Sequence, residues 1–275
     1  MPPENRSHQY ASHRPGSGLR RSFGSFRSIM ALILREMSTQ YGRSVGGYAW
    51  AILEPLGTVF LLAIGFSLIV PAPALGNNFI FSYATGFLPF HAYQQISLVV
   101  ARAIQFSKPL LFYPAVTWVD AILARFFLNA LTNITVTCII FICIYTFEGI
   151  PVLIEVQPIL LGFALMFFLG LGIGVLNCAL LGLYPTWDLV WSIVTRPLFL
   201  ASGIFFIYED MPTQVKDVLW YNPLLHIVGM VRSGFFPSYQ PEYTSIPYVL
   251  GIALATAALG LLILSRHHRD ILQNA

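Results

Sequence analysis

Four ionisable side chains stand inside otherwise apolar stretches of this sequence: Glu54, Asp120, Arg125 and Arg196. An unpaired charge in such a place is costly, so it marks the path of a polar substrate by default. The alternative is that each charge pairs with another helix or extends to the membrane surface. His91 has two similar interpretations, a polar cavity or a packed, hydrogen-bonded histidine. The sequence leaves both open for all five residues.

Aromatic residues accompany these charges. Tyr48 and Trp50 lie at the start of an apolar stretch, where an interfacial belt explains them. A belt does not explain Phe87, Phe90 and Tyr93, which fall in the middle of the next one. A groove lined by aromatic planes suits sugar rings, whose C–H faces pack on such planes. Ordinary helix packing remains the other interpretation.

The sequence lacks the motifs of a nucleotide-hydrolysing or metal-dependent enzyme. Its only lysines are Lys108 and Lys216, and neither belongs to a G-x-x-x-x-G-K-[ST] loop. It contains no H-E-x-x-H and no C-x-x-C motif. We therefore expect no catalytic residue and no metal or cofactor bound by this chain. A net charge of +3 is too small to indicate nucleic acid.

The composition predicts an all-α integral membrane protein. Of 275 residues, 56% are hydrophobic and only 10% are charged, and no Asp, Glu, Lys or Arg occurs from Pro55 to Ala101. A span needs about 20 apolar residues. Six apolar segments satisfy this length: 48–70, 79–101, 119–147, 156–183, 187–207 and 246–265.

Other segments flank these spans within one predicted transmembrane domain, 23–275. Residues 1–22 have the composition of a disordered cytoplasmic tail. Residues 26–41 follow a helical period with an apolar face, which predicts an amphipathic helix in the membrane interface. Residues 208–236 contain two short helical patterns divided by Asn222-Pro223. Each is too short to cross a bilayer, so we predict two external re-entrant helices.

The distribution of Lys and Arg predicts the orientation. Seven arginines precede the first span, Arg102 and Lys108 follow the second, and Arg266 and Arg269 follow the sixth. With six spans, both termini lie in the cytoplasm. Within the fourth span, Gly170 and Gly174 form a small-residue face, which suits close packing inside one bundle or a contact between two copies.

One stretch resembles a known family. The basic amphipathic segment followed by YGRSVGGYAWAILEPL (Tyr41–Leu56) is similar to the start of ABC-2 type export permeases, and most like the membrane subunit of capsular-polysaccharide exporters. The likeness extends over nearly the whole chain and includes NPLLHIVGMVRSGFF (Asn222–Phe236). It does not include residues 1–22, which receive no role.

The resemblance implies an ATP-driven exporter of lipid-linked acidic capsular polysaccharide in a Gram-negative inner membrane. Two permease copies would form a homodimer and pair with two ATP-binding cassette subunits, which carry the ATP and Mg. A periplasmic adaptor or co-polymerase and an outer-membrane export protein are implied too. Candidates for the substrate path are Arg43, Tyr48, Trp50, Glu54, Phe87, Phe90, Tyr93, Arg102, Arg125 and Arg196. Candidates for the ATPase interface are Arg27, Arg35, Glu36, Gln105, Lys108 and Pro109.

Other functions fit the same residues. The nearest is an ABC-2 permease for O-antigen, teichoic acid or a small drug. A membrane enzyme acting on lipid-linked sugars would need an acid–base pair in a loop, where only Glu209-Asp210 occurs. A channel or a secondary transporter is the third alternative.

Overall fold

A computed structural model of the chain describes residues 24–40, 47–111, 116–148 and 154–274. Every regular element in these ranges is a helix, as the composition predicts. The helices are α1 (Gly24–Gln40), α2 (Gly47–Ser67), α3 (Phe79–Ala101), α4 (Ala103–Leu111), α5 (Trp118–Glu148), α6 (Val156–Leu183), α7 (Trp187–Leu200), α8 (Thr213–Leu219), α9 (Pro223–Phe235) and α10 (Ile246–Asn274), with a 3₁₀ turn at Tyr208–Asp210. The predicted tail, 1–22, lies outside these ranges.

Four helices are long and apolar enough to cross a membrane. They are α2 over Ala49–Ser67, α5 over Trp118–Phe147, α6 over Val156–Leu183 and α10 over Ile246–His268. The other two predicted spans differ from these. α3 has 23 residues but carries polar side chains along its length, and α7 has only 14 residues, about 21 Å of helix. The count of six spans therefore stays a prediction.

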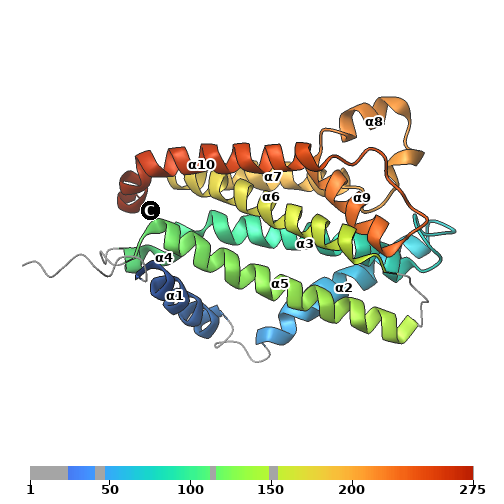
Figure 1. Cartoon of the computed structure of the whole chain (residues 1–275), viewed down its shortest axis with the longest axis horizontal. Coiled ribbons are helices and arrows are strands. Elements are labelled where there is room, and N and C mark those ends of the chain that lie inside the picture. The colour runs from blue at the N-terminus through green and yellow to red at the C-terminus, as the bar shows by residue number, and fades with distance from the viewer. Residues whose placement is uncertain (1–23, 41–46, 112–115, 149–153, 275) are drawn as a thin grey trace, which may run out of the picture.

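The helices form one elongated bundle in which successive long helices run in opposite directions (Figure 1). α1, α4 and the end of α10 lie at one end of the bundle, and α8 lies at the other. We call these the α4 end and the α8 end. α6 occupies the centre, where it packs most extensively against α10, α3 and α9.

Glycines on α6 make this central packing possible. A Cβ atom added to Gly174 would lie 2.7 Å from Cβ of Val100 on α3, and one added to Gly170 would lie 3.1 Å from Cγ2 of Ile96. The small-residue face therefore packs inside one bundle, against α3. Gly182 meets Ile271 of α10 in the same way.

The N-terminal helix α1 packs against α5 at the α4 end. Its inward face is Leu32 and Glu36, both buried. Much of the apolar face predicted from the sequence points outward instead, with Phe26 and Leu34 the most exposed of its members. An outward apolar face and a polar inward contact suit a helix that lies in a membrane interface.

The segment between α7 and α10 is divided as the sequence predicts. Asn222 caps α9, its side-chain oxygen accepting a hydrogen bond from the backbone N–H of Leu224 at 3.0 Å, and Pro223 is the first helical residue. α8 is short, and none of its residues is buried. α9 is buried against α6 and α3. The re-entry of these two helices into the membrane stays a prediction.

Candidate functional site

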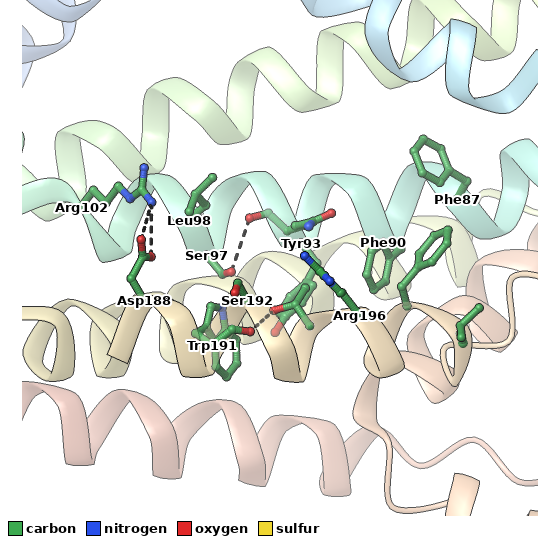
Figure 2. Close-up of a pocket in the computed structure, with 14 residues that line it drawn as sticks. Phe87, Phe90, Tyr93, Ser97, Leu98, Arg102, Asp188, Trp191, Ser192 and Arg196 are labelled. Carbon is green, nitrogen blue, oxygen red and sulfur yellow. Dashed lines mark hydrogen bonds and ion pairs between the residues drawn. The ribbon is translucent and has the colours of Figure 1, made fainter. Parts of the chain in front are cut away.

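A groove of about 670 Å³ runs between α3 and α7 (Figure 2). Both walls combine aromatic, polar and charged side chains. From α3 and the residue that caps it come Phe87, Phe90, Tyr93, Gln94, Ser97, Leu98 and Arg102. From α7 come Asp188, Trp191, Ser192, Thr195, Arg196, Phe199 and Leu200.

Helical spacing brings these residues to one face of each helix. On α7, Asp188, Ser192, Thr195 and Phe199 follow steps of three and four residues, which align side chains along a helix. The character of the groove changes along its length. The Arg102–Asp188 pair occupies one end, serines lie in the middle, and Phe87 marks the other end (Figure 2).

Arg102 and Asp188 close the polar end of the groove. The guanidinium Nη2 of Arg102 lies 3.1 Å from a carboxylate oxygen of Asp188, and each side chain is 49% exposed. An exposed pair of this kind stabilises a fold by about 0–1 kcal/mol. It can therefore be broken at little cost, in contrast to a buried ion pair.

The groove is open because α7 is held mainly at its ends. None of its residues is buried, and its contacts with α6 are few. Near the α4 end, the indole Nε1 of Trp187 donates to Oδ1 of Asn177 on α6 at 2.9 Å. At the other end, Nδ2 of Asn222 donates to the carbonyl of Ala201 at 2.9 Å.

A buried arginine fixes the turn that follows α7. The guanidinium of Arg232, on α9, donates to the carbonyls of Gly203, Ile204 and Phe206, at 2.8 Å for Ile204. Arg232 is only 2% exposed. Gly203 has φ of +76°, a conformation that favours glycine, and it lets the chain turn there. The helix predicted over 187–207 consequently ends at Leu200.

The groove is suited to an elongated, polar and partly anionic ligand. Arg196 is exposed to it and has no hydrogen-bond or ion-pair partner among the described residues. The hydroxyls of Ser97 and Thr195 donate to carbonyls of their own helices, which leaves their oxygens able to accept. Phe90 and Phe199, with ring centroids 5.1 Å apart, add aromatic surface. Cations, acceptors and ring faces together match acidic sugars.

Arg125 lies elsewhere, in a buried ion pair. Its Nε donates to Oε1 of Glu36 at 2.8 Å, with the two side chains 9% and 6% exposed. Its Nη1 donates to the carbonyl of Val99, and its guanidinium stacks 3.9 Å from the ring centroid of Phe106. Burial raises the pKa of the Glu36 carboxyl, and Arg125 opposes that shift. This pair joins α1 to α5, so the structure gives both residues a structural contact.

Five of the ten predicted path residues meet in the groove. They are Phe87, Phe90, Tyr93, Arg102 and Arg196. Trp50 and Glu54 line a separate recess between α2, α3 and α5, together with His91. Arg43 and the side chain of Tyr48 lie outside the part of the chain that the structure describes.

The residues predicted to meet an ATPase gather at the α4 end, on α1 and α4 (Figure 1). Exposed members are Arg27, Arg35, Gln105 and Pro109, with Lys108 half-buried. Glu36 differs from them because it is buried.

Sequence reasoning missed several groove residues, above all Asp188. Its signal was present, because Asp188, Ser192 and Thr195 are polar residues at helical spacing in an apolar stretch. Arg232 lies within the predicted re-entrant segment and was not singled out from the sequence, although it is almost fully buried.

Known proteins resemble this chain over most of its length. It is 29% identical over 234 residues to the polysialic acid transport protein KpsM of Escherichia coli, covering 85% of this chain and 91% of that protein. It is 25% identical over 245 residues to the capsule polysaccharide export inner-membrane protein CtrC of Neisseria meningitidis serogroup A, covering 89% and 92%. The capsule polysaccharide export inner-membrane protein BexB of Haemophilus influenzae is 26% identical over 246 residues, covering 89% of this chain and 92% of that protein.

A sequence profile of one transporter family matches residues 27–236. The matched region includes α3, α7 and the whole groove between them. The chain belongs to the ABC-2 type transporter family.

Proposed function

We propose that this protein is the membrane subunit of an ATP-driven exporter, and that it moves lipid-linked acidic capsular polysaccharide out of the cytoplasm. The names of its relatives support the substrate class, because they are polysialic acid transport and capsule polysaccharide export inner-membrane proteins. The α3–α7 groove carries the proposal, since it combines Arg102 and Arg196 with hydroxyls and aromatic rings along one open channel wall.

The proposal includes partners and an orientation. The chain would act as a homodimer with two ATP-binding cassette subunits, because the sequence has no phosphate-binding loop of its own. α1 and α4 would meet the ATPase, which places the α4 end and both termini in the cytoplasm. α3 and α7 would complete six spans in an inner membrane. A periplasmic adaptor and an outer-membrane export protein would receive the polymer.

ATP binding would act on the groove through α4. α4 follows α3 directly after Arg102, so a displacement of α4 would change the Arg102–Asp188 contact at the polar end. The two states would differ in how far α7 stands from α3, and ATP would shift the population between them.

Blocking the groove tests the proposal, and α7 offers a matched pair of variants. Ser192→Trp fills the groove, whereas Ile193→Trp adds the same side chain to a position that is 66% exposed and outside the groove. In a strain whose own copy is deleted, we expect Ser192→Trp to leave capsule inside the cell and Ile193→Trp to restore it to the surface. Surface capsule and membrane level of each variant are measured together.

Normal surface capsule with Ser192→Trp would contradict the proposed path. Normal surface capsule in the deletion strain itself would contradict capsule export and favour another substrate. Export that continues with a hydrolysis-deficient ATPase would favour a channel or a secondary transporter.

A further inference from the structure

A second polar site lies on the neighbouring face of α3. It is a recess of about 270 Å³ between α2, α3 and α5. Each helix contributes polar or aromatic residues four positions apart, which places them on one face. The pairs are Trp50 and Glu54, His91 and Gln95, and Asn129 and Asn133. The recess is separate from the groove, because His91 and Gln95 follow the groove residues Phe90 and Gln94 by one position.

Hydrogen-bond acceptors line the recess beside His91 and Gln95, whose Nε2 atoms lie 3.5 Å apart. The side-chain amide of Asn129 bonds the carbonyl of Arg125 at 2.9 Å, and that of Asn133 bonds the carbonyl of Asn129 at 2.9 Å. A backbone carbonyl can only accept a hydrogen bond, so the donating atom of each amide is Nδ2. The side-chain oxygen Oδ1 of each asparagine is left able to accept. The hydroxyl of Thr132 likewise donates a hydrogen bond to the carbonyl of Leu128. The carboxylate of Glu54 makes no hydrogen bond and no ion pair within the ranges that the structure describes, although its charge acts on His91 in the same recess.

The position of the recess decides what these acceptors can contact. His91 lies near the middle of α3 and Asn133 near the middle of α5, and the recess reaches the first residues of α2, where Trp50 and Glu54 lie. α5 is one of the helices able to cross a membrane. Glu54 is exposed on α2, another such helix, and a carboxylate there without a hydrogen-bond or ion-pair partner is unfavourable in lipid. The recess must therefore meet water or a ligand that donates hydrogen bonds.

We propose that the recess binds an uncharged sugar ring of the exported polymer through its hydroxyl groups. This inference rests on the proposed function. Glu54, Asn129 and Asn133 would accept hydrogen bonds from hydroxyls, and the carboxylate would disfavour an anionic group. Trp50 is 62% exposed and offers a ring face beside them. The volume lies just below the range of about 300–1,000 Å³ that holds drug-sized ligands, which suits a single ring.

The two sites would then bind different groups of the polymer. The α3–α7 groove presents Arg102 and Arg196 to acidic groups, and the recess presents Glu54 to neutral ones. An acidic polysaccharide with neutral hydroxyls offers both.

Photocrosslinking in exporting cells tests the inference. A benzophenone amino acid replaces Trp50 in the recess, Trp191 in the groove, or Leu61, an exposed apolar residue farther along α2. Only variants that keep surface capsule are irradiated, and adducts are detected by antibody to the polymer. We expect adducts from positions 50 and 191 and none from 61. Asn133→Leu, added to the position-50 variant, should lower its adduct yield about tenfold, the factor for one lost hydrogen bond.

Each outcome decides between the two proposals. Adducts from position 191 without any from position 50 would overturn the recess as a sugar site and leave the proposed function standing. Adducts from neither position would overturn both. A yield at position 50 that Asn133→Leu and Glu54→Gln leave unchanged would show polymer passing without binding, which also overturns the inference. An adduct to lipid or to a second copy at position 50 would assign the recess to that occupant instead.

Discussion

α7 and α9 are helices of nearly equal length that differ in burial. α9 has 13 residues, and eleven of them are buried, including Arg232. α7 has 14 residues, and none is buried. Each carries an arginine, but Arg232 donates to three carbonyls while Arg196 faces an open groove. Burial with both terminal nitrogens of Arg232 bonded to backbone carbonyls indicates a structural role, and the exposure of Arg196 without a partner among the described residues indicates a place for a ligand.

Removing Arg232 should have the largest effect on stability. Arg232→Met leaves three carbonyls at the end of α7 without their donor, and each buried unsatisfied group costs about 1–3 kcal/mol. We expect a loss of more than about 3 kcal/mol in the free energy of unfolding. Thermal unfolding of the purified protein in detergent measures it. If Arg232→Met unfolds at the wild-type temperature, the contrast between α7 and α9 is wrong.

The Glu36–Arg125 pair offers a second buried site for comparison. Glu36→Ala leaves a guanidinium buried without its carboxylate, and we expect a loss of about 3 kcal/mol. The double variant Glu36→Leu with Arg125→Leu removes both charges and should regain most of that stability. Denaturation of the wild type and the two variants provides the measurement. A double variant no more stable than Glu36→Ala would show that charge burial does not explain the effect.

Arg196 should behave in the opposite way. Arg196→Glu places a negative charge where an acidic polymer would pass, so export should fall about tenfold or more, equivalent to about 1.4 kcal/mol. The unfolding temperature should change little, because the side chain is exposed. Surface capsule per unit of membrane-inserted protein is the readout, with Arg196→Lys as the charge-preserving control. If Arg196→Glu lowers the amount of membrane-inserted protein and not the export per inserted protein, Arg196 has a structural role.

The Arg102–Asp188 contact should give the smallest change in stability. Asp188→Asn breaks an exposed pair, so we expect less than about 1 kcal/mol in unfolding free energy. Export should change more than stability, because Arg102 is freed at the mouth of the groove. Exchanging the charges, Arg102→Asp with Asp188→Arg, should restore the pair but not normal export. Normal export from the exchanged pair would reduce Arg102 to a structural role.

Much of the helical framework could be predicted from composition and periodicity. The bounds predicted for the spans at 79–101 and 156–183 coincide with α3 and α6, because long apolar runs with polar flanks define them. The break at Asn222-Pro223 was predictable from capping chemistry. The aromatic cluster on α3 was predictable too, since its three members recur at helical spacing.

Long-range partners could not be predicted in this way. Arg125 and Glu36 are 89 residues apart, so nothing local shows that they pair. The end of α7 depends on Arg232, whose donors reach carbonyls 26 to 29 residues earlier in the chain. The sequence ASGIFFI (201–207) is as apolar as α7 before it. Periodicity reports the face of a helix, and tertiary contacts decide where that helix stops.

The central claim is that polymer moves through the space between α3 and α7. Ser97 and Ser192 lie on opposite walls of that space (Figure 2). In a chain whose Cys138, Cys143 and Cys178 are replaced by serine, a reversible thiol crosslinker joins Ser97→Cys to Ser192→Cys. We predict that crosslinking stops the appearance of capsule at the surface and that a reductant restores it, while each single cysteine variant exports throughout. Continued export by fully crosslinked protein would contradict the claim.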